Sequence, residues 1–167
     1  MTITWRIMTC ALFIVFGSAL AVAEAQRTAP QDDPVIGVWQ LDLSKSHYMP
    51  GPAPLREIRT YEFEHEGIKA TIVTTGADGR DAKVEYVASY NDVVALVTGS
   101  DRIDAIKLRK TNDTTAEVTL SYQGRAVGTA RRVIAPDGRS MTITFKRDEP
   151  TPINNVAYYT KVAQATN

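Results

Sequence analysis

Two histidines, several tyrosines and a few arginines are the side chains of this sequence that could do chemistry. His47 and Tyr48 are neighbours in a proline-rich stretch, and Arg59 follows in a predicted strand. These three candidate catalytic residues could transfer protons and stabilise an anion without a metal. The alternative for His47 and Tyr48 is an ordinary pair of solvated loop residues.

The second histidine, His65, lies between two glutamates that a strand would point to the opposite face. Two widely spaced histidines without a nearby cysteine make a poor zinc site, so we predict no metal site and no cofactor. The sequence also lacks a G-x-S-x-G elbow, an H-E-x-x-H helix, a phosphate loop and a dinucleotide fingerprint. No motif therefore assigns a reaction, and whether the protein is an enzyme stays open.

Tyrosines recur in the predicted strands, most of them in phase with apolar neighbours: Tyr61, Tyr86, Tyr90, Tyr122 and Tyr158. Such rings either fill a β core or form the wall of a small-molecule pocket with a few phenolic donors. Arg59 shares the phase of Tyr61, so it joins Tyr61, Tyr86, Tyr90 and Tyr122 as a candidate ligand-binding residue. If that face is internal, Arg59 must be paired or must bind an anion. A different strand register would turn it outward.

The elements that must position these residues are short strands, each closed by turn residues. The alternation of apolar and polar residues predicts strands over 35–43, 56–65, 68–75, 82–90, 92–98, 102–110, 115–123, 126–135, 140–147 and 153–162. The connectors are typical of tight hairpins, as in Ala77-Asp78-Gly79 and Pro136-Asp137-Gly138. We therefore predict an all-β protein, an antiparallel up-and-down meander that closes into a barrel, with a β-sandwich as the alternative.

One long connector interrupts this pattern between the first two predicted strands. It contains Pro50, Pro52 and Pro54, which exclude both a helix and an interior strand there. We expect a stiff crossover loop at this position.

The N-terminal residues have the layout of a secretory signal peptide. A single cation, Arg6, precedes an apolar run and then small residues, which predicts cleavage after Ala25, with Ala23 as the competing site and an uncleaved anchor as the alternative. The predicted organisation is a signal peptide over 1–25, a flexible lead-in over 26–34 and one barrel domain over 35–167. The only cysteine, Cys10, lies in the leader, so the mature chain would hold no disulfide. This favours a bacterial periplasmic or secreted protein.

The charge balance limits the classes of partner. The sequence has 19 lysines and arginines against 19 aspartates and glutamates. Without a basic excess, nucleic-acid binding is not favoured. The polar faces of the predicted strands are rich in Thr, Lys and Glu, so we expect no stable membrane insertion after signal cleavage. The sequence gives no basis for an oligomeric state.

The start of the first strand, Gly37-Val38-Trp39, resembles the Gly-x-Trp start of the lipocalins and their calycin relatives. The longer string through the proline-rich loop is similar to exported bacterial lipocalin-like proteins of uncharacterised function. The resemblance implies that Gly37 and Trp39 close one end of a barrel. It also implies that Trp39 packs against a basic side chain from a late strand, for which Arg131 and Arg132 are the candidates.

Three functions follow as expectations. The first is binding of a small, partly apolar molecule inside the barrel. The second is a cofactor-free isomerase, cyclase or lyase that uses the same cavity, as some calycin relatives do. The third is a protein-binding module of the cell envelope that uses the proline-rich loop or an exposed strand edge.

Overall fold

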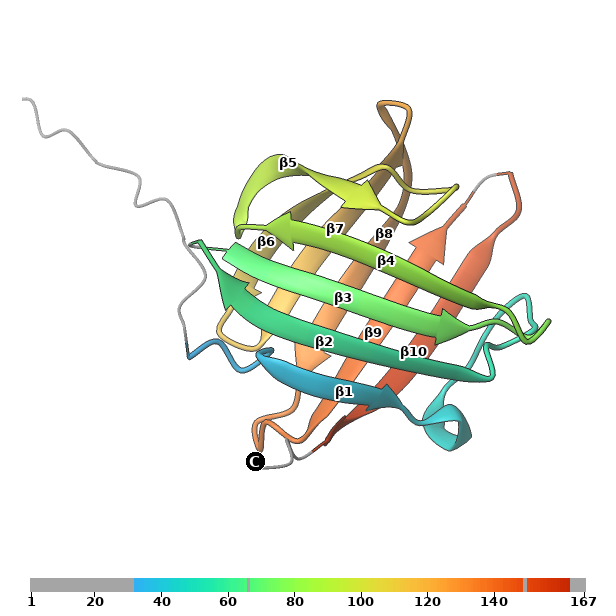
Figure 1. The fold of residues 1–167 in the computed structure, drawn as a ribbon, viewed down its shortest axis with the longest axis horizontal. Coiled ribbons are helices and arrows are strands. Elements are labelled where there is room, and N and C mark those ends of the chain that lie inside the picture. The colour runs from blue at the N-terminus through green and yellow to red at the C-terminus, as the bar shows by residue number, and fades with distance from the viewer. Residues whose placement is uncertain (1–31, 66, 149, 163–167) are drawn as a thin grey trace, which may run out of the picture.

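The computed structural model describes residues 32–65, 67–148 and 150–162, so the predicted signal peptide and most of the lead-in lie outside the described residues. The described chain forms ten β-strands and one short 3-10 helix, η1 (Leu43–Lys45), as Figure 1 shows. The strands are β1 (Gly37–Leu41), β2 (Arg56–Glu64), β3 (Gly67–Thr75), β4 (Asp81–Ala88), β5 (Asn91–Thr98), β6 (Ala105–Asn112), β7 (Thr115–Tyr122), β8 (Arg125–Ile134), β9 (Ser140–Arg147) and β10 (Ile153–Val162). The described residues include no helix long and apolar enough to cross a membrane.

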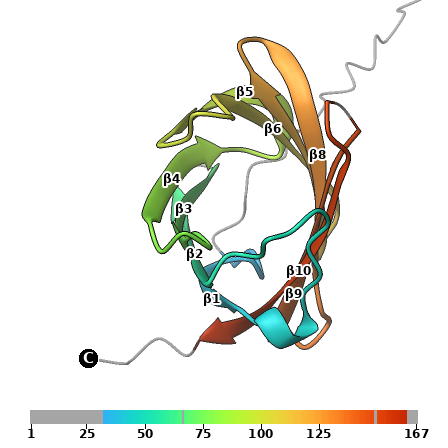
Figure 2. The same cartoon turned by 90° about the vertical axis from the view of Figure 1, so that its right-hand side faces the viewer.

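The ten strands form one closed antiparallel barrel in which each strand pairs with its neighbours in sequence. Closure comes from β1, which pairs with β2 on one side and with β10 on the other, for example Trp39 with Arg59 and with Lys161. Figure 2 looks at the end that carries η1 and shows the strands arranged around a ring. The predicted barrel is confirmed, and the β-sandwich alternative is wrong.

The strands begin and end close to the residues predicted from the alternation of apolar and polar side chains. This agreement has a simple cause, because the turn residues fix where each strand stops. At the β7–β8 turn, Gln123 and Gly124 have positive φ angles of 51° and 76°, the left-handed conformation that tight hairpins need. The proline-rich connector forms no strand and is linked to β10 by backbone hydrogen bonds between His47 and Val156.

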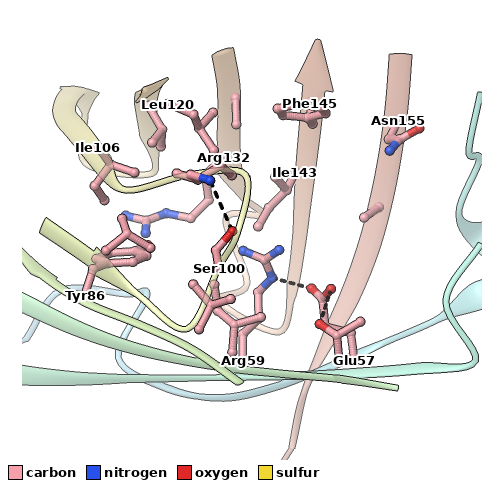
Figure 3. A pocket seen from close by; sticks show the side chains of 18 of the residues that line it. Glu57, Arg59, Tyr86, Ser100, Ile106, Leu120, Arg132, Ile143, Phe145 and Asn155 are labelled. Carbon is pink, nitrogen blue, oxygen red and sulfur yellow. Dashed lines mark hydrogen bonds and ion pairs between the residues drawn. The ribbon is translucent and has the colours of Figure 1, made fainter. Parts of the chain in front are cut away.

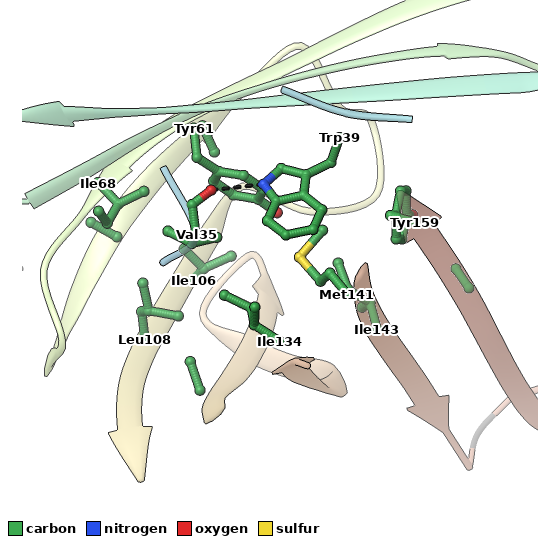
Figure 4. Close-up of a cluster of buried hydrophobic side chains, with 14 of the residues drawn as sticks. Val35, Trp39, Tyr61, Ile68, Ile106, Leu108, Ile134, Met141, Ile143 and Tyr159 are labelled. Atoms are coloured by element: carbon green, nitrogen blue, oxygen red, sulfur yellow. Dashed lines mark hydrogen bonds between the residues drawn. The ribbon is translucent and has the colours of Figure 1, made fainter. Parts of the chain in front are cut away.

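One end of the barrel, the Trp39 end, is filled by a compact cluster of buried side chains (Figure 4). Its fully buried members are Val35, Trp39, Tyr61, Ile68, Leu108, Met141 and Tyr159. The segment before β1 is part of this closure, since Trp39 Nε1 donates a 2.7 Å hydrogen bond to the Val35 carbonyl. Two residues before Val35, the buried Asp33 carboxylate accepts a 2.8 Å hydrogen bond from Lys110 Nζ. The interior that remains free lies beyond this cluster.

The wall of the barrel is least continuous between β4 and β5. These two strands pair at only two positions, Glu85 with Thr98 and Tyr86 with Val97, whereas β5 continues along β6. Val93 and Leu96 of β5 are exposed on the outside of this part of the wall.

Candidate functional site

The barrel interior holds a partly open cavity of about 350 Å³ between the Trp39 end and the opposite end (Figure 3). We call the opposite end the loop end; it carries η1, residues 46–55 and residues 99–104. The wall of the cavity is mostly apolar and comes from strands β2 to β10, the 99–104 loop and Tyr48 of the proline-rich connector. Its apolar side chains are Ile72, Val84, Val97, Ile103, Ile106, Val118, Leu120, Ala130, Ile143, Phe145 and Ala157.

The polar part of the wall contains a hydrogen-bonded network centred on Glu57. Its carboxylate accepts hydrogen bonds from Arg59 Nε at 2.6 Å, from the Tyr159 hydroxyl at 2.6 Å and from the Thr74 hydroxyl at 3.0 Å. Arg59 Nε also lies 3.1 Å from the Tyr159 hydroxyl. The four residues come from β2, β3 and β10. Strand β2 pairs directly with β3, and β1 pairs with both β2 and β10. Each charge in this network has its partner within the network.

The pKa values of this network follow from burial and pairing. Burial by itself would raise the pKa of Glu57, but the Arg59 guanidinium and the three hydrogen bonds outweigh it and hold the pKa below its usual value. Burial likewise opposes the charge on Arg59, and Glu57 outweighs it, so the pKa of Arg59 is well above normal. Burial raises the pKa of the Tyr159 phenol, which stays protonated. Glu57 and Arg59 are therefore both ionised at neutral pH.

A second arginine, Arg132 of β8, reaches the cavity nearer the Trp39 end. It is only 5% exposed, and one of its Nη atoms donates a 2.6 Å hydrogen bond to the Tyr90 hydroxyl. Its guanidinium carbon lies 5.3 Å from the centre of the Tyr61 ring and 5.8 Å from that of Tyr90. Burial opposes its charge, but the surrounding phenols Tyr90, Tyr61 and Tyr86 outweigh it and raise the pKa of Arg132. Among the described residues, no carboxylate forms an ion pair with it.

The three candidate catalytic residues do not meet at one point. Tyr48 and Arg59 line the cavity, whereas His47 is exposed and contributes its backbone to the bridge with Val156. Burial, with a further contribution from the Glu57 charge, raises the pKa of Tyr48 to about 12. No group of three potential metal ligands occurs among the described residues.

The predicted ligand-binding residues separate into two groups. Arg59, Tyr61 and Tyr86 line the cavity, and Tyr90 is buried behind it, where it holds Arg132. Tyr122, the remaining predicted ligand-binding residue, does not line it, and neither does the strand tyrosine Tyr158. The ring of Tyr158 faces the other way, under Lys45 Nζ at 4.9 Å. The register of β2 with β1 and β3 turns Arg59 inward, which settles the orientation that the sequence left open.

The basic partner of Trp39 differs from the expectation. Lys161 Nζ lies 5.0 Å from the centre of the Trp39 ring, because Lys161 is directly opposite Trp39 in the β1–β10 pair. Arg132 stacks instead on two tyrosines, and Arg131 is exposed on the outer face of β8. Gly37 makes room for this arrangement, since a Cβ there would lie 2.7 Å from Lys161 Cε.

Sequence reasoning missed Glu57, Tyr159 and the inward role of Arg132. Glu57 has the same phase as Arg59 and Tyr61, and that signal could have placed it inside the barrel. Tyr159 shares the phase of the buried Ala157, but the neighbouring Tyr158 made the phase of this strand ambiguous. The contact between Tyr159 and Glu57 spans 102 positions of sequence, and only the closed barrel reveals it.

Comparisons of the chain with family models, with curated proteins and with solved structures found no match.

Proposed function

We propose that this protein binds a small, largely apolar molecule in the interior of the barrel. The observation that carries the proposal is the cavity of about 350 Å³ with its mostly apolar wall. Small-molecule sites are cavities of roughly 300 to 1,000 Å³ that combine apolar walls with a few placed polar groups. The cavity meets both criteria, at the small end of that range.

The distribution of side-chain sizes supports a hollow interior. Large side chains gather at the Trp39 end, whereas the inward positions next to the cavity include Ala130 and Ala157. The apolar atoms that line this space lack protein packing contacts on the side that faces it. A ligand that fills it would return those contacts.

The lipocalin resemblance of the Gly37–Trp39 segment supports the same proposal. Lipocalin barrels hold a ligand inside, although they have eight strands and this barrel has ten. Fold likeness is a weak guide to function, so the resemblance adds to the cavity and does not replace it. The signal-peptide layout of residues 1–25 is consistent with a ligand met in the periplasm or outside the cell.

The geometry favours binding over catalysis. A general base works best with a pKa near the operating pH, but the Arg59 charge and three hydrogen bonds hold the pKa of Glu57 below its usual value. The His47 side chain, the other candidate base, does not line the cavity. A role for the proline-rich loop in protein binding is supported only by exposed Met49 and Leu55, and it leaves the cavity unexplained.

A fluorescence titration with N-phenyl-1-naphthylamine, an uncharged apolar dye, tests the proposal. We expect saturable binding by the wild type and its loss in Ala130→Phe, which places a ring in the cavity. Thr129→Phe is the matched control, because Thr129 is the exposed neighbour on the same strand. Equal dye binding by both variants, or no binding by the folded wild type, would contradict the proposal.

A further inference from the structure

We propose that the ligand carries a single anionic group, of the carboxylate class, and that Arg132 binds this group at the inner end of the cavity. The inference deepens the proposed function and rests on it. The apolar body of the ligand would extend from Arg132 toward the loop end.

The charges that line the cavity do not cancel. Among the described residues, Glu57, Arg59 and Arg132 are the charged side chains of the wall. Glu57 and Arg59 form a 2.6 Å ion pair and neutralise each other. Arg132 therefore leaves one positive charge facing the cavity.

The acidic side chain that acts on Arg132 is already engaged. Asp33 adds to the attraction that raises the pKa of Arg132, but its carboxylate is paired with Lys110 Nζ at 2.8 Å. A buried charge without a carboxylate partner is costly to keep in a protein interior. An interior that serves only uncharged ligands would gain stability from an apolar side chain at this position.

The guanidinium is held in place before any ligand arrives. Its hydrogen bond to Tyr90 and the rings of Tyr61 and Tyr90 fix its orientation. A guanidinium has five N–H donors, and Tyr90 is the one side-chain acceptor that the described residues provide. The remaining donors can bind the two oxygens of a carboxylate, the geometry for which arginine is suited.

The position of Arg132 along the barrel sets the direction of the ligand. On β8, Arg132 pairs with Ile143, while Ala130 pairs with Phe145 nearer the loop end. Leu120 and Phe145 lie farther along the cavity than Arg132 and offer only apolar surface (Figure 3). Among the described wall residues, the other cation is Arg59, which is already paired with Glu57, so a second negative charge on the ligand would be repelled there by the Glu57 carboxylate. One anionic group therefore fits and two do not.

The test compares a fatty carboxylate with the alcohol of the same length. Decanoate and 1-decanol are titrated against bound N-phenyl-1-naphthylamine, at neutral pH and below the micellar concentration of decanoate. We expect the wild type to bind decanoate at least about tenfold more tightly than 1-decanol, the ratio that one charge-assisted hydrogen bond supports. Arg132→Gln should remove this preference, and Arg132→Lys should keep part of it.

Arg131→Gln is the matched control, because it removes the same charge from the exposed neighbour on the same strand. It should keep the wild-type preference. Tyr90→Phe retains the Arg132 charge but removes its hydrogen bond, so it should weaken decanoate binding and leave 1-decanol binding unchanged. This variant keeps the test informative if Arg132→Gln does not fold, as checked by circular dichroism.

Two results would overturn the inference. If the wild type binds decanoate and 1-decanol equally, the cavity has no anion site, although the proposed function stands. If Arg132→Gln folds and keeps the preference for decanoate, the anion is bound elsewhere. Failure of the wild type to bind the dye, decanoate and 1-decanol would reject the proposed function and the inference together.

Discussion

At the scale of single residues, the interior is defined by how its buried charges are satisfied. Glu57 and Arg59 are two positions apart on one strand, so both point inward, and Tyr159 and Thr74 complete their hydrogen bonding. Arg132 contacts the Tyr90 hydroxyl and the rings of Tyr61 and Tyr90, and no carboxylate forms an ion pair with it among the described residues. The first arrangement stabilises the wall of the cavity, and we propose the second as the site for a ligand.

The Glu57–Arg59 pair should make the stability of the protein depend on acid pH. The pKa of Glu57 is lowered in the folded state from a reference of 4.5, so its contribution is present above about pH 4.5 and is lost as the pH falls through the folded-state pKa. Glu57→Gln leaves Arg59 buried without a counter-charge. We expect it to lower the free energy of unfolding at pH 7 by about 3 kcal/mol, with a smaller difference from wild type at pH 3.

Urea denaturation at the two pH values measures this effect. Glu117→Gln is the control, since Glu117 pairs with Arg109 on the surface, where both side chains are well exposed. An exposed ion pair contributes about 0 to 1 kcal/mol. An equal loss of stability in the two variants at pH 7 would show that Glu57 is not the buried partner of Arg59.

The sequence could predict features that depend only on the alternation of side chains between the two faces of a strand. It placed Tyr86 in phase with the apolar residues of its strand, because alternate residues of a strand share a face, but it left the direction of the Arg59–Tyr61 face open. It could not assign the cation over Trp39, which depends on the register between the first and last strands. Lys161 became that cation because it lies opposite Trp39 across the closing seam.

At the scale of elements, the turns determine the strand boundaries and shape the loop end of the cavity. Gly99 ends β5 and begins the 99–104 loop, which contributes Ser100 and Ile103 to the cavity wall. Its φ of +80° and its close approach to the Lys83 carbonyl both require glycine. This packing anchors the loop to β4, where the barrel wall is least continuous.

Two glycine-to-alanine substitutions distinguish the free-energy cost of the left-handed backbone conformation from the cost of steric crowding. Gly79 has nearly the same φ, +79°, but nothing lies within 4 Å of a Cβ there, whereas a Cβ on Gly99 would clash with the Lys83 carbonyl oxygen. We expect Gly79→Ala to cost about 1 kcal/mol from the left-handed conformation alone. Gly99→Ala should cost about 1 to 3 kcal/mol more, because the backbone must move.

The free energies of unfolding of these two variants, from urea titrations with equal slopes, provide the comparison. Losses that agree within error would mean that the loop is not packed against β4 as described.

At the scale of the whole molecule, the barrel is filled at one end and hollow toward the other. The meander and its ten strands could be predicted from the sequence, because each hairpin is a local pattern. The cavity could not, because its volume depends on the combined sizes of inward side chains from nine strands. The Glu57 network was out of reach for the same reason, since β2 and β10 meet only through β1 when the barrel closes.

The most direct test of a hollow, ligand-binding barrel is a crystal structure of the wild type with a brominated fatty acid, 11-bromoundecanoate. We predict a bromine anomalous peak inside the barrel, on the loop-end side of the cavity beside Leu120 and Phe145. An interior without ligand density at saturating concentration, with the molecule bound only on the outer surface, would contradict the account.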